Sequence, residues 1–244
     1  MVTLGVDLAS QPKRTATCLI RWHLGSARVE SLSPGATDAD LHELFGRADK
    51  IGIDAPFGWP APFTRAVAAY SEETIWPAAE VPQLRFRRTD EFVRERLGRW
   101  PLSVSTDLIA VPAIRAVRLL AETAATGESI DRSGGGRFVE VYPAAALHVW
   151  GFPSRGYKRA RGAAVRARLA SDLAERIADW FTLSEEDWAQ CTASDDLLDA
   201  VVAALVARAA ALSRCEPIPP GDEELAKEEG WIALPQAGSL EHLP

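Results

Sequence analysis

Apolar residues are grouped into three short segments at the start of the chain, and these segments predict three β-strands. Val2–Ala9 is almost wholly apolar, whereas Thr15–His23 and Ala27–Leu32 show β-branched or alternating patterns. Gln-Pro and Leu-Gly breaks separate the segments. We therefore expect three consecutive strands joined by short turns.

The pattern then changes to helical spacing and returns to a strand. Thr37–Arg47 begins with a threonine suited to an N-cap and repeats its apolar residues at helical intervals. Ile51-Gly-Ile-Asp54 follows as a short buried strand. The order predicted up to this point is βββαβ.

The middle of the chain is rich in proline and arginine and interrupts this order. Prolines beginning at Pro56 end the fourth strand, because proline cannot continue a hydrogen-bonded ladder. We interpret residues of about 72–130 as an insertion that precedes a fifth strand, Phe138–Tyr142. Helices are predicted in and around it over Phe63–Ser71, Asp90–Leu97 and Ala113–Thr126.

Two helical segments and a tail complete the chain. Ala163–Phe181 has apolar residues spaced by four, and Ser194–Leu212 begins with an N-cap serine and continues as a nearly uninterrupted apolar helix. The tail, about 216–244, is rich in proline and acids, and we expect it to pack across the surface. The whole pattern predicts one α/β domain over residues 1–244, with a mixed five-stranded sheet and flanking helices.

Composition is that of an ordinary folded protein. The chain has 244 residues, a length sufficient to bury one full core. Its residues are 47% hydrophobic and 25% charged, close to the averages for soluble globular proteins. No apolar run approaches the roughly 18 residues that a membrane span needs, and the first residues do not resemble a secretory leader. We therefore expect a cytoplasmic protein with no membrane partner; the pattern indicates no oligomeric state.

Charge narrows the choice of partners. A formal net charge of −7 disfavours indiscriminate binding to phosphate backbones, which needs clustered lysine and arginine. The segment Arg155–Arg168 nevertheless carries six cations and no acid. We therefore expect any contact with nucleic acid to be confined to this basic run. The alternative interpretation is that the run is the solvent-exposed face of a helix.

Two acids lie where a buried sheet would not tolerate them alone. Asp7 stands within the first strand and Asp54 at the end of the fourth, so each ionised carboxylate needs a cation or hydrogen-bond donors to offset its desolvation. Open α/β sheets bind ligands at the carboxyl ends of their strands. The two acids therefore indicate one site, and the alternative is that backbone amides of a neighbouring loop satisfy each of them.

Further acids could reach the same site. Asp196 and Asp199 are three residues apart near the start of the last long helix, so they project from about the same face and can converge on one ion. For Asp196 the alternative is stabilisation of the helix N-terminus through the macrodipole. Glu140 shares a strand face with Phe138 and Tyr142, and it could reach either solvent or the same cleft.

Clustered carboxylates without histidine or cysteine partners suit a hard cation. Mg²⁺ and Mn²⁺ prefer oxygen ligands, and one or two such ions can promote the in-line hydrolysis of a phosphodiester. Arg87 and Arg88 in the insertion and Lys158 in the basic run are candidates for contact with phosphate. For the insertion, the alternative is a set of surface ion pairs among its charged residues.

The order of these motifs resembles the ribonuclease H-like superfamily, in which Holliday-junction resolvases end in a similar Asp-x-x-Asp-Ala helix. It looks still more like the family of unknown function designated DUF429, described as predicted nucleases of this fold. The resemblance spans roughly residues 2–235. The motifs that carry it are Gly5-Val-Asp7-Leu-Ala9, Ile51-Gly-Ile-Asp54-Ala-Pro56, Arg88-Thr-Asp90, Glu140-Val-Tyr-Pro143 and Asp196-Leu-Leu-Asp199-Ala.

This resemblance implies a metal-dependent nuclease that acts on DNA or RNA. The implied ligands of Mg²⁺ or Mn²⁺ are Asp7, Asp54, Asp196 and Asp199. Glu140 inherits a catalytic role less directly, because in resolvases the second acid lies on the fourth strand, a position that Asp54 occupies here.

Two other functions fit the same sequence. A phosphotransferase of the actin and sugar-kinase branch would share the core fold, but it needs glycine-rich phosphate loops after later strands, and Gly134–Gly136 precedes its strand. A catalytically inactive binding protein on the same fold would explain the acidic net charge and the insertion.

Overall fold

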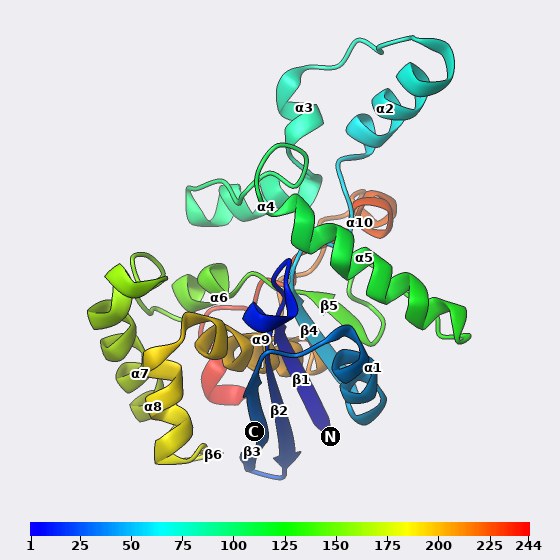
Figure 1. Ribbon diagram of the computed structural model, residues 1–244. Helices are drawn as coiled ribbons and strands as arrows, with labels where there is room; N and C mark the ends of the chain where they lie inside the picture. Colours follow the sequence, from blue (N-terminus) through cyan, green and yellow to red (C-terminus); the bar gives the residue numbers. More distant parts are fainter.

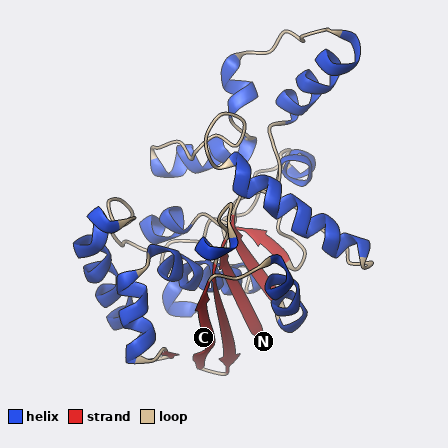
Figure 2. Ribbon diagram, viewed as in Figure 1, coloured by secondary structure: helices blue, strands red, loops and turns tan.

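A computed structural model describes residues 1–244 as an α/β protein built on one sheet (Figures 1 and 2). Strands β1 (Val2–Asp7), β2 (Ala16–His23) and β3 (Ser26–Pro34) form an antiparallel series. On the other side of β1, strand β4 (Lys50–Asp54) runs parallel to it, and β5 (Phe138–Glu140) runs parallel to β4. The five predicted strands are therefore all present.

The prediction that the sheet has only five strands was wrong. A sixth strand, β6 (Phe181–Thr182), pairs with the edge of β3 and gives the order β5-β4-β1-β2-β3-β6. The helix expected to continue to Phe181 ends at Ile177, as α7 (Ala163–Ile177). A strand of two residues has no alternation that periodicity could detect, and it exists because the edge of β3 offers free backbone partners.

Helices cover both faces of the sheet. On one face, α9 (Asp195–Ala211) lies against β1, β2 and β4, with α6 (Pro143–Val149) and α7 beside it and α8 (Glu185–Ala193) packed on α7 and α9. On the other face, α1 (Asp38–Arg47) and α5 (Ala110–Ala125) cover the alternate residues of β1 and β4. None of the helices is both long enough and apolar enough to span a bilayer.

The predicted insertion is a group of helices between β4 and β5. Its helices are α3 (Val81–Arg85), which was not predicted, α4 (Arg88–Leu97) and α5, and α2 (Ala61–Glu73) comes before the predicted start at about residue 72. In Figure 1, α2, α3 and α4 lie beyond the carboxyl ends of β1 and β4, and α2 and α3 project farthest from the sheet. The insertion therefore stands over the edge of the sheet where the predicted acids end their strands.

The C-terminal tail does not lie across the surface as expected. Its helix α10 (Glu223–Glu229) is followed by the segment Trp231–Leu234, whose apolar residues are buried against α4. The Glu229 carboxylate accepts hydrogen bonds from the backbone N–H of Ala61 and of Arg88, each at 2.7 Å. The tail is thus a structural link between the insertion and the rest of the fold.

Two glycines allow α9 to approach the sheet closely. A Cβ atom on Gly5 would lie 2.0 Å from the backbone oxygen of Ala200, and one on Gly52 would lie 2.5 Å from that of Ala203. Any larger residue would push the helix away. Gly5 and Gly52 are also register partners in adjacent strands, so they make one flat surface on which the alanines of α9 rest.

Candidate metal centre

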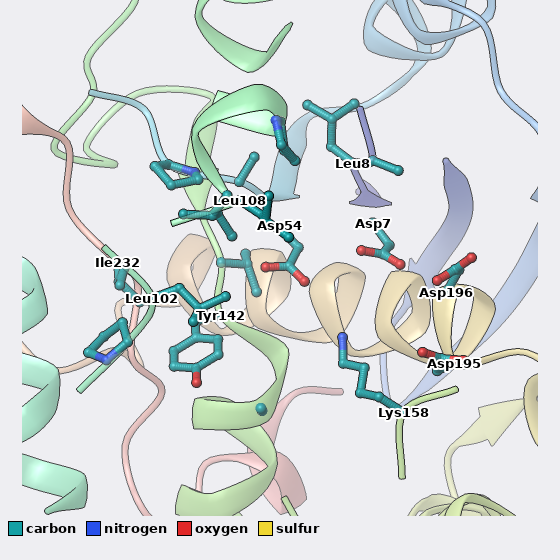
Figure 3. Close-up of a pocket in the computed structure, with 18 of the residues that line it drawn as sticks. Asp7, Leu8, Asp54, Leu102, Leu108, Tyr142, Lys158, Asp195, Asp196 and Ile232 are labelled. Carbon is teal, nitrogen blue, oxygen red and sulfur yellow. The ribbon is translucent and has the colours of Figure 1, made fainter. Parts of the chain in front are cut away.

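Strands β1 and β4 place two aspartates side by side at their carboxyl ends. Asp7 and Asp54 are register partners in the parallel pairing. Each follows by two residues a glycine that touches α9, and alternate residues of a strand face the same side. Both carboxylates therefore point to the face that α9 covers (Figure 3).

Helix α9 brings a third aspartate to the same point. Asp199 lies one helical turn before Ala203, which rests on Gly52, and this spacing sets Asp199 over the strand ends. Its side chain is fully buried. Carboxylate oxygens of Asp7, Asp54 and Asp199 all lie within 4.8 Å of one another. Three separate elements thus supply one cluster of oxygen ligands.

The fourth predicted ligand, Asp196, lies at the margin of this cluster. Its side chain is 28% exposed and its carboxylate is 3.7 Å from the guanidinium of Arg14. Burial and the charge of Asp195 raise the pKa of Asp196, and the charges of Arg14 and Lys158 partly offset that rise. Asp196 therefore lies near Asp7 but remains open to the cleft (Figure 3).

Burial raises the pKa of each of the three clustered acids, and the charges of other members of the cluster add to the rise for Asp7 and Asp54. For Asp7 the pKa is raised well above its usual range, by burial first and then by the charges of Asp54 and Asp199. Burial raises the pKa of Asp54 to about 7, against the opposing charge of Lys158. Burial also raises the pKa of Asp199. Such a cluster keeps protons near neutral pH unless a cation replaces them.

Tyr157 and Lys158 contact the buried acid from the side of the cleft. The Tyr157 hydroxyl donates to Asp199 Oδ1 at 2.8 Å, and the Lys158 ammonium donates to Asp199 Oδ2. Burial lowers the pKa of Lys158, but the charge of Asp199 outweighs it and the pKa is raised well above its usual range. Lys158 is thus a fixed positive charge at the site, although 46% of its side chain is exposed.

The loop that carries these two residues is held by a buried arginine. The guanidinium of Arg166 donates to the backbone oxygens of Tyr157 and Thr192, each at 2.8 Å. These bonds fasten the loop to the end of α8, beside the first turn of α9. Lys158 was predicted as a contact of phosphate, and its ion pair with Asp199 was not predicted. The contact of Tyr157 with Asp199 was missed too, because a tyrosine inside a basic run has no spacing that marks it as a partner of an acid.

Glu140 does not join the cluster. It pairs in register with Ile53, whose side chain packs on the face opposite α9, so its carboxylate points toward the insertion. There it is buried, and it accepts hydrogen bonds from both terminal nitrogens of Arg87, at 2.7 and 2.8 Å, and from the Phe57 N–H at 2.9 Å. Its position is that of a structural ion pair.

Arg87 and Arg88, predicted to contact substrate, have partners inside the protein. Arg87 is 2% exposed and forms ion pairs with Asp90, at 3.1 Å, and with Glu140. The ion pair between Arg87 and Asp90 lies within the insertion and is buried, whereas the alternative interpretation placed such pairs at the surface. Arg88 binds Asp222 at 2.9 Å and Glu95 at 3.2 Å. These contacts join α4 to β5 and to the tail.

The glycine-rich segment lies at the opposite end of the sheet from the acids. It precedes β5, and the Lys50 ammonium at the start of β4 donates to the backbone oxygens of Gly134, at 3.0 Å, and Gly136. The acids stand at the carboxyl ends of the same strands. A phosphate loop built on these glycines would therefore be remote from the carboxylate cluster.

A cleft of about 530 Å³ opens over the clustered acids. The acids form one side, and the insertion supplies an apolar wall that includes Leu102 and Leu108 (Figure 3). Arg14, Lys158 and Arg159 also line the cleft, so cations stand close to the carboxylates. The cleft thus combines oxygen ligands, positive charge and an apolar surface.

Comparison with known proteins gives one match. A family model described as "Protein of unknown function (DUF429)" matches residues 5–224, a range that includes all five of the predicted acids, Asp7, Asp54, Glu140, Asp196 and Asp199. No curated protein and no solved structure gives a significant match to the chain.

Proposed function

This chain belongs to the DUF429 family of proteins of unknown function, and from its site we propose that it is a Mg²⁺- or Mn²⁺-dependent nuclease that hydrolyses phosphodiester bonds of DNA or RNA. One observation carries the proposal: Asp7, Asp54 and Asp199 converge within 4.8 Å from two strands and a helix. Three converging like charges, that of Asp199 buried and those of Asp7 and Asp54 half-buried, destabilise a fold unless a cation or protons neutralise them. Their convergence is therefore explained most simply by a bound ion.

The donor set fits a hard divalent cation. All three donors are carboxylate oxygens, and no histidine or cysteine is part of the cluster, which favours Mg²⁺ or Mn²⁺ over zinc. A bound ion would lower the pKa of a coordinated water and offset the charge that develops on a phosphodiester. One or two ions are compatible with the proposal, because Asp196 stands beside Asp7 as a further oxygen donor.

The remaining residues of the cleft would receive the substrate. Lys158 places a positive charge against Asp199, and Arg14 places another near Asp196. These cations weaken the repulsion between the acids and an incoming phosphate. Asp196, half-buried at the mouth of the cleft, is placed to accept a proton or to orient a water molecule.

The same proposal includes the ribonuclease H-like fold for the core. That resemblance rests on the order of the elements, which is three antiparallel strands followed by two parallel strands. It also rests on the acids of the first strand, the fourth strand and the last long helix. In this account β6 and the insertion are additions to the core. Residues 1–244 would form one domain, since the tail packs on the insertion and pairs with β5.

Cleavage assays test the proposal. Labelled single-stranded, duplex and branched DNA and RNA are incubated with the protein and Mg²⁺, Mn²⁺ or EDTA. We expect cleavage that requires the ion and falls by at least about 100-fold in Asp7→Asn and Asp199→Asn. Asp172→Asn is the matched control, because Asp172 is an exposed residue of α7 that pairs only with Arg168.

An inactive protein that still binds the ion would contradict this function. If no substrate is cut while Mn²⁺ binds to the wild type and not to Asp199→Asn, the site is a metal centre without nuclease activity. The alternative of a binding protein on the same fold would then be the better account.

A further inference from the structure

We propose, on the basis of the nuclease function above, that the cleft continues into a second, basic pocket that binds phosphates next to the cleaved one, so that the substrate is a single-stranded polynucleotide. The basic run Arg155–Arg168 carries six cations and no acid. Three of its six cations have partners within the protein. Lys158 forms an ion pair with Asp199, and Arg168 forms one with Asp172 at 3.8 Å. Arg166 is buried and donates hydrogen bonds to backbone oxygens.

The other three cations of the run, Arg155, Arg159 and Arg161, are exposed and form no ion pair. Arg159 lines the cleft over the acids. Arg155 lines a neighbouring pocket of about 410 Å³ that contains no acidic residue. Two of the three unpaired cations, Arg155 and Arg159, therefore lie along these two recesses, and Arg161 lies outside them.

The two recesses share part of their walls. Arg99 and Ser154 line both of them, so a ligand can pass from the carboxylate cluster into the basic pocket without leaving the protein surface. His148 and Phe152 complete the far side of the second pocket. Together they form a path that begins at the acids and runs along cations.

Arg99 places an unsatisfied hydrogen-bond donor on this path. One of its terminal nitrogens donates to the backbone oxygen of Ala144 at 3.1 Å, but its Nε is buried and has no hydrogen-bond partner. Arg99 also forms no ion pair, and its guanidinium lies 5.9 Å from the ring centre of Tyr142. A buried, unmet donor on a charged group is costly, and a phosphate oxygen would satisfy it.

The shape and lining of the path favour a single strand over a duplex. Both recesses are bounded in part by the insertion, and a flexible unpaired strand can follow such walls more closely than a rigid duplex. Tyr142, which is partly exposed, places an aromatic ring on the wall of the cleft, 5.9 Å from the guanidinium of Arg99. Basic grooves with aromatic rings that stack on bases are typical of proteins that bind single strands.

Oligonucleotide binding tests this inference separately from cleavage. The anisotropy of a labelled 12-nucleotide single strand is measured against protein concentration at several salt concentrations, with Ca²⁺ as the cation because it accepts oxygen ligands in looser geometry than Mg²⁺. We expect Arg99→Gln and Arg155→Gln each to weaken binding several-fold. Each should reduce the magnitude of the slope of log affinity against log salt by about 0.7, the value for one lost contact with single-stranded phosphate.

Arg168→Gln is the matched control, because it removes a cation from the same run outside both recesses. Arg155 is exposed, so its variant tests the inference even if Arg99→Gln unfolds. Unchanged binding in Arg155→Gln, or a duplex of the same sequence that binds as tightly as the single strand, would overturn the inference. A wild type that binds the single strand with the expected salt dependence but never cuts it would instead overturn only the nuclease function.

Discussion

Asp54 shows at the scale of a single residue how burial and ion binding are connected. Burial raises its pKa to about 7, and a divalent ion binds only the deprotonated carboxylate, so ion and proton compete. Lowering the pH from 8 to 6 should therefore weaken Mn²⁺ binding by about tenfold, as expected for one proton released near pH 7. Calorimetric titration at the two pH values measures this. An affinity that does not change with pH would contradict it.

Lys158 should set the pH at which that competition occurs. Its charge lowers the pKa of Asp54 and of Asp199 against the effect of burial. In Lys158→Met both pKa values should rise, and the midpoint of Mn²⁺ binding against pH should move to higher pH. Lys227→Met on α10, remote from the acids, is the control. A midpoint that moves equally in both variants would show that Lys158 has no special effect.

The residues of the site differed in how far the sequence could predict them. Asp7 and Asp54 were predictable, because each is an acid in an otherwise buried strand and parallel strands end at the same edge of a sheet. Glu140 was not, because its face depends on how β5 is aligned with β4, and alternation within β5 alone does not give that alignment. Arg99 was missed because its partners lie far away in the sequence.

At the scale of the element, the site depends on the close approach of α9 to β1 and β4. A Cβ atom at Gly5 would meet the backbone of Ala200 at 2.0 Å, which neither side can avoid by changing a rotamer. Gly5→Ala should therefore lower the free energy of unfolding by about 1–3 kcal/mol or more, as is usual for overpacking. It should also weaken Mn²⁺ binding, because Asp199 moves with the helix. Urea denaturation and calorimetric titration give the two values.

The control for this prediction is Gly46→Ala in α1, where an added Cβ would have no atom within 4 Å. Alanine is favoured over glycine in a helix by up to about 1 kcal/mol, so this variant should be neutral or more stable. If Gly5→Ala unfolds at the same urea concentration as Gly46→Ala, α9 is not held by the contact described here.

The elements that the sequence predicted are those that repeat a pattern over several turns or several alternations. Strands β1 to β3 and helices α1, α5 and α9 are of this kind. Helices α3, α6, α8 and α10 were missed because segments of five to nine residues are too short for a period to be evident. Helices of this length are stable only through tertiary contacts, which the local sequence does not describe.

At the scale of the whole molecule, the cluster makes stability depend on pH in an unusual direction. The folded pKa of Asp54 is raised above the unfolded value of 3.8, so the folded protein binds more protons than the unfolded one over this range. Stability from this group is present at low pH and is lost as pH rises through about 7. In EDTA, the melting temperature should therefore increase when the pH is lowered from 8 to 6, as measured by calorimetry.

Asp54→Asn separates this effect from a general response to pH. The variant cannot ionise at this position, so in EDTA at pH 8 it should melt at a higher temperature than the wild type. Mn²⁺ should stabilise the wild type and have little effect on the variant. A variant that melts lower than the wild type in EDTA would show that the Asp54 carboxylate is stabilising by itself, and that the repulsion described here is absent.

The arrangement of the whole molecule was the least predictable level. The insertion and the tail meet through contacts such as that of Glu229 with Ala61, which are separated by 168 residues in the sequence. No local pattern indicates such a contact. The sequence therefore predicted neither the apolar wall that the insertion supplies to the cleft nor the burial of the tail. The acidic net charge likewise hides the local gathering of cations around the cleft.

The most direct test is to locate the ion itself. A crystal soaked in Mn²⁺ and measured at a wavelength where manganese scatters anomalously would show where the ion binds. The account predicts a peak about 2.1–2.2 Å from carboxylate oxygens of Asp7, Asp54 and Asp199, the usual distance for a small hard cation. An absence of any peak beside these three aspartates, at Mn²⁺ concentrations that fill other carboxylate sites in the crystal, would contradict it.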